Sequence, residues 1–451
     1  MKKIFIANRG EVAVRIITTA KKLGISTVLS VSEADTSSYA ASLADETISV
    51  GPIPAAASYL SIDNMLKAIK DSGADAVHPG SGFLSEKPDF ARAVQEIGAT
   101  WIGPDPEIIE MMGDKSAARK VAQEAGVPVI PGIEGALTPD DDIVAIAEEI
   151  GYPLVVKASS GGGGRGIRLV TSPDNLISTV EITQAEAKAS FGDARVYLER
   201  FIPQARHVEV QILGDGKDNY VHVGDRDCSL QRRHQKLVEE ATAPDLPRSV
   251  REEIRNSSVK LARQCGYSGA GTVEFLYDPA SHEAFFIEMN TRLQVEHPIT
   301  EMLTGLDLVE EQIRIARGEG ISFSQEELNF SGHAIEVRIN AEDPHNNFMP
   351  SPGTINTLTF PSGEGIRVDS GVKEGSVVSP FYDSLLFKII VHADSRDQAI
   401  NTMLQALDNL SIKGVLTTSP MAQALISTTA FREVTHYSTF VEEHPEILEE
   451  L

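Results

Sequence analysis

The chain has 451 residues, of which 41% are hydrophobic and 23% charged, a composition typical of a folded protein with about three domains. Its formal net charge of -25 and its lack of a long Lys/Arg block argue against nonspecific binding to nucleic acid. The N-terminal segment breaks into Asn8, Arg9 and Glu11 too early for a signal peptide, and no apolar run reaches membrane-spanning length. We therefore expect a cytoplasmic protein that binds no membrane.

The first 113 residues alternate between short apolar runs and amphipathic stretches. The apolar runs include "IFIAN", "STVLSVS", "ADAVHPG" and "TWIG", and the first amphipathic stretch is "EVAVRIITTAKKLG". Gly24, which follows two lysines and a leucine, is a typical helix C-terminal stop. This βαβ rhythm predicts a parallel sheet covered by helices.

The next segment, residues 114 to 130, predicts a helix that ends near Gly126 and then a connection punctuated by prolines. We interpret this connection as a domain boundary. Between Gly151 and Ile202, two strand candidates flank a glycine loop, and a helix and the strand "VYLERFI" follow. A small α+β module is expected there.

A short loop with four consecutive glycines, Gly161 to Gly164, follows the apolar strand that ends at Lys157. Its backbone N–H groups could surround a polyphosphate, with Lys157 supplying positive charge. Because the loop leads into another strand, it matches neither the Walker A pattern nor the Rossmann fingerprint. The alternative is a flexible linker. By themselves, Lys115 in "GDKSAARK" and Glu199 in "YLERF" look like a surface charge and a strand residue.

From about Pro203 onward, strand patterns dominate, including "HVEVQILGD", "NYVHVGDRDC", "GTVEFLYD", "AFFIEMN" and "HAIEVRINAE". Helices are predicted near residues 247 to 264 and 301 to 317. The two cysteines, Cys228 and Cys265, cannot form a disulfide framework and lack metal-site spacing, so we expect packing residues in a reducing compartment.

Two of these strands carry a carboxylate among large apolar residues, Glu274 and Glu288. If the strands form a hairpin that turns about "DPASHE", with Ser281 at its centre, the two carboxylates lie directly opposite each other. Like charges across paired strands destabilise a sheet, and a divalent cation would reverse that cost. Asn290, on the same face, completes a set of oxygen ligands suited to Mg²⁺. The alternative is that one carboxylate is protonated or solvated.

The stretch "NTRLQVEHP" places polar side chains at every second position, at Asn290, Arg292, Gln294 and Glu296. If the segment is extended, these four groups share one face of a strand. Arg, Gln and Glu together suit a small oxyanion, whereas the alternative is a half-solvated strand. Phosphate loop, metal ligands and anion cradle would then meet at one site.

Several long motifs now stand in a fixed order: "ANRGE", "HPGSGFLSE", "MGDK", "KASSGGGGRG", "RHVEVQ", "RDCSLQRRHQK", "EMNTRLQVEHP", "EVRINAED" and "YDSLL". Together they resemble the biotin carboxylase family of the ATP-grasp superfamily over essentially the whole chain. The resemblance implies an α/β and α+β fold with four parts. These are an N-terminal Rossmann-like domain (1–113), a connecting helix and linker (114–130), an ATP-grasp lid (131–202), and an ATP-grasp core with the C-terminal biotin carboxylase domain (203–451).

The resemblance also implies roles for individual residues. The ATP contacts would be Lys115, Lys157, Gly163, Gly164, Glu199, Ile202, His207, His234, Glu274 and Glu288, with Gln231 and Glu209 as further candidates. The ligands of Mg²⁺ or Mn²⁺ would be Glu274, Glu288 and Asn290. Bicarbonate would bind Lys236, Arg292, Gln294 and the Val295 backbone, and Arg338 would stabilise the biotin enolate. From the residues alone, His207, His234 and Arg338 would be solvated strand residues.

In the implied reaction, Glu296 removes the bicarbonate proton, bicarbonate attacks the γ-phosphate of ATP, and the resulting carboxyphosphate yields CO₂ for biotin. One position departs from the family pattern: Ser81 stands where a Tyr is usual, which puts the packing of biotin in doubt. Two alternatives remain, another ATP-grasp ligase that joins a carboxylate to an amine, and a catalytically inactive nucleotide-binding subunit.

The chain contains no Met-Lys-Met tripeptide of the kind that carries biotin in related systems, and no length for a second large domain. We therefore expect one subunit of a multicomponent carboxylase. Its expected partners are a second copy of the chain, a biotin carboxyl carrier protein or domain, and a carboxyltransferase subunit. The final acceptor stays open among acetyl-CoA, propionyl-CoA, pyruvate and 2-oxoglutarate.

Overall fold

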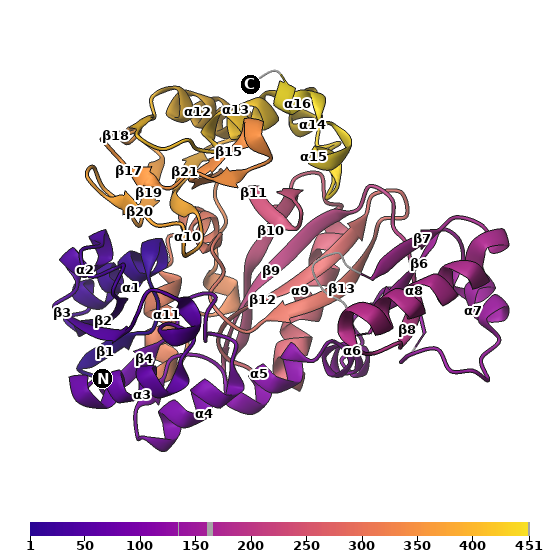
Figure 1. The fold of residues 1–451 in the computed structure, drawn as a ribbon, viewed down its shortest axis with the longest axis horizontal. Helices are drawn as coiled ribbons and strands as arrows, with labels where there is room; N and C mark the ends of the chain where they lie inside the picture. Colours follow the sequence, from indigo (N-terminus) through magenta and orange to yellow (C-terminus); the bar gives the residue numbers. More distant parts are fainter. Residues whose placement is uncertain (134, 160–165, 450–451) are drawn as a thin grey trace.

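The computed structural model describes residues 1–133, 135–159 and 166–449 (Figure 1). Most of the predicted phosphate loop, including Gly163 and Gly164, lies outside the described residues. Within the described part, no helix is long and apolar enough to cross a membrane.

The N-terminal part is a five-stranded parallel sheet with the order β3-β2-β1-β4-β5. The strands are β1 (Lys3–Ile6), β2 (Ser26–Ser32), β3 (Glu46–Gly51), β4 (Ala76–His78) and β5 (Thr100–Trp101). The helices are α1 (Gly10–Lys22), α2 (Tyr39–Leu43), α3 (Ile62–Ser72), α4 (Pro88–Glu96) and α5 (Pro106–Gly113). The predicted parallel sheet is confirmed, and β3 is a strand that the apolar pattern did not indicate, because it is mostly solvent-exposed.

A small module extends to one side of the molecule (right in Figure 1). It contains α7 (Ile143–Ile150), β6 (Leu154–Ala158), β7 (Ile167–Val170), α8 (Leu176–Phe191) and β8 (Val196–Arg200). Its antiparallel sheet has the order β7-β6-β8, so the predicted α+β module is confirmed. The helix α6 (Lys115–Glu124) precedes it, as predicted for the connection.

The centre of the molecule is an eight-stranded antiparallel sheet with the order β13-β12-β9-β10-β11-β14-β21-β19. Its strands are β9 (Arg206–Asp215), β10 (Tyr220–Arg232), β11 (Gln235–Ala241), β12 (Ser268–Asp278), β13 (Glu283–Asn290), β14 (His333–Asn340), β19 (Ile366–Ser370) and β21 (Leu385–Ala393). The helices beside it are α9 (Arg248–Gln264), α10 (His297–Thr304) and α11 (Leu308–Ala316). The single helix predicted over 301 to 317 is wrong, because Gly305, with φ +74, ends α10 before α11 begins.

The C-terminal part packs two long helices on the end of this sheet. Its strands are β15 (Glu342–Asp343), β16 (Met349–Pro350), β17 (Gly353–Thr354), β18 (Thr357–Thr359), β20 (Val377–Val378) and β22 (Ser411–Lys413). Its helices are α12 (Arg396–Asp408), α13 (Ser419–Ser427), α14 (Thr429–Arg432), α15 (Phe440–Glu443) and α16 (Glu446–Glu449). Short 3-10 helices cover Ala55–Ala57, Pro173–Asn175, Gln325–Glu327 and Pro344–Asn346. Buried residues such as Ile335, Phe387, Met403 and Leu425 form one core here.

Candidate active site

The predicted hairpin exists, and Glu274 of β12 pairs directly with Glu288 of β13. The turn is centred between Ala280 and Ser281 rather than on Ser281, because Asp278 pairs with Glu283. One extra residue, Ile287, bulges from β13 and restores the predicted pairing at the two carboxylates. The pairing of the two carboxylates was therefore predicted correctly. The predicted hairpin reached it with a turn centred on Ser281 and no bulge.

The predicted strand over the alternating polar row is wrong beyond its first residue. β13 ends at Asn290, and Glu296 already caps the N-terminus of α10. Pro298 lies in the first turn of α10, a position that proline favours in a helix. The polar side chains nevertheless meet: the Arg292 guanidinium donates to Gln294 Oε1 and to Asn290 Oδ1, each at 3.0 Å.

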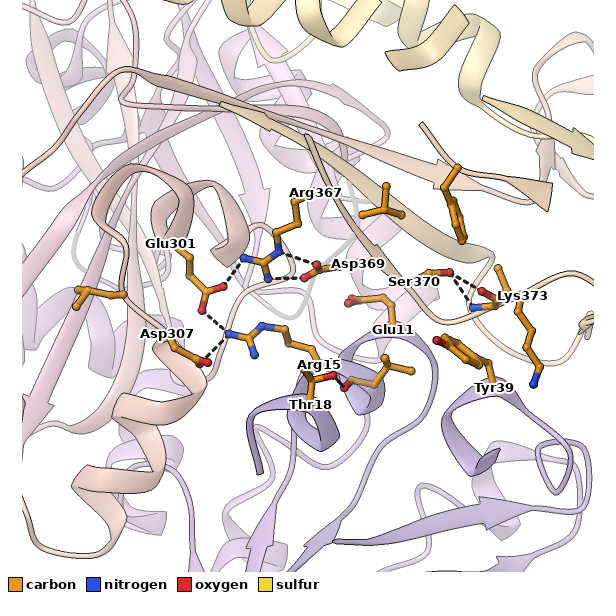
Figure 2. A pocket seen from close by; sticks show the side chains of 15 residues that line it. Glu11, Arg15, Thr18, Tyr39, Glu301, Asp307, Arg367, Asp369, Ser370 and Lys373 are labelled. Carbon is orange, nitrogen blue, oxygen red and sulfur yellow. Dashed lines mark hydrogen bonds and ion pairs between the residues drawn. The ribbon is translucent and has the colours of Figure 1, made fainter. Parts of the chain in front are cut away.

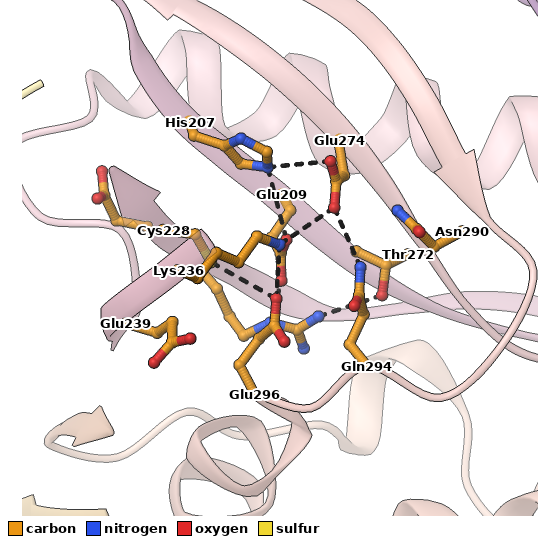
Figure 3. A network of polar contacts seen from close by, with 12 residues as sticks. His207, Glu209, Cys228, Lys236, Glu239, Thr272, Glu274, Asn290, Gln294 and Glu296 are labelled. Carbon is orange, nitrogen blue, oxygen red and sulfur yellow. Dashed lines mark hydrogen bonds and ion pairs between the residues drawn. The ribbon is translucent and has the colours of Figure 1, made fainter. Parts of the chain in front are cut away.

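Lys236, at the start of β11, is the centre of the site (Figure 3). Its Nζ lies 2.6 Å from Glu209 Oε2, 2.6 Å from Glu296 Oε1 and 3.1 Å from Glu274 Oε1. Although burial opposes the charge, the nearby acidic groups raise the pKa of Lys236 well above its usual range. The site thus contains a permanent cation surrounded by carboxylates from three other elements.

Glu296 is completely buried between two cations. Its Oε1 accepts from Lys236, and its Oε2 accepts from Arg338 Nη2 at 3.0 Å. Although burial favours the neutral acid, Lys236, Arg338 and Arg226 hold the pKa of Glu296 well below its usual range. Glu296 is therefore an ionised carboxylate at the centre of the site.

Arg338 on β14 reaches this centre, which the strand pattern alone did not indicate. Its Nε donates to Glu239 Oε1 at 2.6 Å, and β11 and β14 are neighbouring strands. The pattern around Arg338 is that of an ordinary strand, because nothing in one strand reveals which charged group its neighbour supplies. Only the family motif pointed to this residue.

The structure also adds residues that the sequence reasoning did not select. Glu86 accepts from Arg292 Nε at 2.8 Å and from the Thr291 N–H at 3.0 Å. Ser81, on the same loop, accepts from Arg292 Nη1 at 3.1 Å, so the position that departs from the family pattern contacts the anion cradle directly. The signal for Glu86 was its place in the "HPGSGFLSE" motif.

A second layer of missed residues supports Glu209, which was predicted only as a further candidate. The completely buried Arg226 donates from Nε to Glu209 Oε1 at 2.6 Å and from Nη1 to Thr300 at 3.0 Å. Cys228 is also buried, with its Sγ 3.8 Å from Glu296, and burial raises the pKa of its thiol. It is therefore a packing residue at the edge of the site, as predicted.

Among the predicted nucleotide contacts, Lys157 on β6 forms an ion pair with Glu199 on β8. Arg119 lies 3.4 Å from the same carboxylate, and Lys115 is exposed at the start of α6. The strand positions that were predicted for Lys157 and Glu199 are confirmed, and both side chains point to one side of the small sheet.

Four other residues were predicted to contact the nucleotide. His207 Nε2 is 3.1 Å from Glu274 Oε2, and Gln231 is buried beside Cys228. Ile202 is buried in a small apolar cluster, whereas His234 is exposed in the turn between β10 and β11. Although burial opposes its charge, Glu274 raises the pKa of His207.

The three predicted metal ligands, Glu274, Glu288 and Asn290, each carry side-chain oxygen atoms, and their role as ligands stays a prediction. Burial raises the pKa of Glu288, and the negative charge of the facing Glu274 raises it further because like charges repel. Asn290 Oδ1 adds a third oxygen, and its buried Nδ2 has no partner among the described residues. Oxygen ligands of this kind suit Mg²⁺ or Mn²⁺.

Two other groups of potential ligands lie close together among the described residues: His207 with Glu209 and Glu274, and Glu209 with Cys228 and Glu296. The Lys236 ammonium already contacts the carboxylates of both groups, and a thiol is a poor ligand for Mg²⁺.

Three family models match successive parts of the chain. They are the biotin carboxylase N-terminal domain over residues 1–109, the ATP-binding domain of the carbamoyl-phosphate synthase L chain over 114–323, and the biotin carboxylase C-terminal domain over 336–443. Biotin carboxylase 1 of Bacillus subtilis is 47% identical over 431 residues, which is 96% of each chain.

The chain belongs to the biotin carboxylase family. Members are ATP-dependent ligases, so the predicted family, enzyme class and fold are confirmed. A pyruvate carboxylase subunit of Methanothermobacter thermautotrophicus is 47% identical over 98% of this chain and 90% of its own. The biotin carboxylase domain dimer of Hydrogenobacter thermophilus 2-oxoglutarate carboxylase, solved with MgADP and bicarbonate, is 44% identical, with a TM-score of 0.90 over 99% of this chain and 98% of its own.

Proposed function

We propose that this biotin carboxylase uses ATP and bicarbonate to carboxylate biotin on a separate carrier protein. The observation that supports this most directly is the convergence of Lys236 and Arg338 on Glu296, with Arg292 linked to the same cluster through Gln294. One cluster then contains cations for an anion, a base for its proton and a second cation for a developing enolate.

Bicarbonate would bind to Lys236, Arg292, Gln294 and the Val295 N–H, next to Glu296. The low pKa of Glu296 ordinarily describes a weak base, and it is set by Lys236 and Arg338. An anion that takes hydrogen bonds from these cations and adds its own negative charge raises the proton affinity of Glu296. The base would thus become active when its substrate is bound.

In the proposed reaction, Glu296 takes the bicarbonate proton and a bicarbonate oxygen attacks the γ-phosphorus, which breaks the bond to ADP and forms carboxyphosphate. Carboxyphosphate breaks down to CO₂ and phosphate. The phosphate then removes the ureido N–H proton of biotin, Arg338 stabilises the enolate, and the ureido nitrogen bonds to CO₂. Glu296 then releases its proton to the solvent, so atoms and charges balance without a redox partner.

ATP would contact Lys115, Lys157, Glu199, Ile202, His207, Gln231, His234, Glu274 and Glu288, together with Gly163 and Gly164. Glu274, Glu288 and Asn290 would hold Mg²⁺ or Mn²⁺, which neutralises phosphate charge when bound. The ion pair between Lys157 and Glu199 would open or rearrange as the lysine turns to a phosphate.

The partners proposed are a second copy of the chain, a biotin carboxyl carrier protein or domain, and a carboxyltransferase subunit. The dimer of the Hydrogenobacter thermophilus domain and the name of the Methanothermobacter thermautotrophicus relative support this assembly. Those two relatives belong to a 2-oxoglutarate and a pyruvate carboxylase, so we propose an acyl-CoA or 2-oxoacid carboxylase without choosing the acceptor.

Phosphate release is the direct test. We expect release from ATP that requires Mg²⁺, bicarbonate and biotin together, and that increases strongly when the biotinylated carrier replaces free biotin. Release that needs an amine instead of bicarbonate and biotin would indicate another ATP-grasp ligase. No release with any carrier, despite nucleotide binding, would indicate an inactive protein.

A further inference from the structure

A completely buried lysine, Lys388 on β21, touches the backbone of the anion cradle. Its Nζ donates to the Val295 carbonyl oxygen at 2.5 Å and lies 3.3 Å from Glu11 Oε2. Lys388 pairs across the strands with Arg338, so these two cationic side chains lie on the same face of the central sheet. None of the proposed reaction steps uses this ammonium group.

Burying an ammonium group is costly unless charges and hydrogen bonds compensate. Glu11, Glu336 and Asp369 supply the charges and, against the effect of burial, raise the pKa of Lys388. Glu11 comes from α1 of the N-terminal part and lines a separate cavity of about 610 Å³ (Figure 2). The ion pair with Glu11 therefore explains why Lys388 can be charged, but not why its ammonium is directed to a backbone carbonyl.

A second buried side chain holds the neighbouring peptide group. His297 Nδ1 lies 2.8 Å from the Gln294 carbonyl oxygen, which can only accept, so Nδ1 is the donor. Burial and the nearby cations Lys388 and Arg15 hold the pKa of His297 well below its usual range, so the ring is neutral. The two peptide groups that flank Val295 are thus each held by a different side chain.

Peptide planarity links these carbonyls to the N–H groups on the opposite side. In a trans peptide, C=O and N–H point in opposite directions, so a fixed Gln294 C=O fixes the Val295 N–H, and a fixed Val295 C=O fixes the Glu296 N–H. Neither N–H has an acceptor among the described residues. The backbone here turns its acceptors to buried donors and leaves its donors available.

We propose that Lys388 and His297 are positioning residues that clamp the peptide groups on both sides of Val295 and direct the Val295 N–H to the bound anion. This inference rests on the proposed function, because the anion is bicarbonate. The clamp supplies preorganisation: an N–H donor that is already oriented costs no reorganisation when charge develops on the anion.

The first test follows the Val295 N–H itself in protein labelled with ¹⁵N-valine, with the signal assigned by a Val295→Ala variant. Titrated bicarbonate should shift this signal saturably in the unmodified protein. In Lys388→Met, whose side chain keeps the apolar part of the lysine, the same shift should require at least about ten-fold more bicarbonate. This readout needs no turnover. A shift without biotin carboxylation would reject the proposed function and keep the clamp, whereas no shift in the unmodified protein would reject the clamp.

The second test separates the clamp from the ion pair by kinetics. Lys388→Met should raise the KM for bicarbonate about ten-fold while the KM for MgATP stays within two-fold. Glu11→Gln keeps the lysine donor and should change neither KM. The double variant Glu11→Gln/Lys388→Met should be more thermally stable than Lys388→Met, because it leaves no unpaired Glu11 carboxylate, but it should keep the raised KM for bicarbonate. The clamp is wrong if the double variant recovers a normal KM for bicarbonate, or if Glu11→Gln raises it as much as Lys388→Met.

His297 offers a conservative rescue. Asn can present an amide N–H close to the position of Nδ1, whereas Leu cannot donate. His297→Leu should raise the KM for bicarbonate. His297→Asn should bring this KM most of the way back to the value of the unmodified protein. Equal KM values for bicarbonate in the two variants would remove His297 from the clamp.

Discussion

The proposed anion end and the proposed nucleotide end of the site are held in different ways. Glu296 and Lys236, at the anion end, have side chains that are 0% and 12% exposed, and each makes several short polar contacts. Lys157 and Glu199, at the nucleotide end, are 26% and 10% exposed and depend mainly on their own ion pair in a small three-stranded sheet. A short-lived intermediate needs a rigid, dry cradle, whereas a nucleotide must enter and leave. Substitutions at the two ends should therefore change different kinetic constants.

The largest effect is expected from Glu296→Gln, which removes the proposed base. Bicarbonate-dependent phosphate release should fall by about 10² to 10⁴-fold, the usual contribution of a general base. MgATP affinity, measured by titration calorimetry, should stay within a few-fold, because Glu296 belongs to the anion end. The exposed Glu283→Gln is the matched control and should behave like the unmodified protein. A parallel loss of nucleotide affinity would contradict the separation of the two ends.

Arg292→Ala should have the next largest effect, about 10²-fold in kcat/KM for bicarbonate. Its guanidinium contributes to both anion binding and the transition state, so KM should rise and kcat should fall together. Steady-state kinetics with varied bicarbonate measures both constants. The highly exposed Arg248→Ala serves as the control, and unchanged kinetics in Arg292→Ala would exclude Arg292 from the site.

Lys157→Gln tests the nucleotide end. The KM for ATP should rise about ten-fold, the cost of losing one charge-assisted hydrogen bond to phosphate. The KM for bicarbonate should stay the same, because the cradle is held by other strands. Kinetics with each substrate varied in turn would show this difference. A rise in both KM values would contradict the separation of the two ends.

The smallest effect concerns Glu288, which lies between the two ends. Its pKa is raised in the metal-free protein, so its favourable contribution to stability is present at low pH and is lost as pH rises through the folded-state pKa. Glu288→Gln should therefore stabilise the metal-free protein at pH 8 by about 0.2–1 kcal/mol and raise the Mg²⁺ needed for half-maximal activity several-fold.

Chemical unfolding with EDTA at pH 5 and pH 8 would measure the change in unfolding free energy for Glu288→Gln, and a Mg²⁺ titration of phosphate release would measure the second effect. A marked loss of stability in the metal-free variant would show that the carboxylate pair is structural.

Much of the fold could be predicted, because strand and helix periodicity are local. The parallel sheet of the N-terminal part, the small α+β module and the Glu274–Glu288 pairing were predicted from such patterns. The errors occurred where tertiary packing changes direction. The strand expected through Glu296 ends at Asn290, and the helix expected over 301 to 317 is interrupted at Gly305. The assigned domain boundaries and residue roles stay predictions.

The sequence by itself determined the order of the motifs, the alternation of polar groups from Asn290 to Glu296 and, with them, the family. Only the tertiary structure decided which charges meet. Lys236 and Arg338 stand 60 and 42 residues from Glu296, and they contact it because β11 and β14 are neighbours in the central sheet and α10 begins beside them. Lys388 reaches the Val295 carbonyl across 93 residues for the same reason. Periodicity describes which face a side chain takes along one element, whereas the charges that face it come from strands distant in sequence.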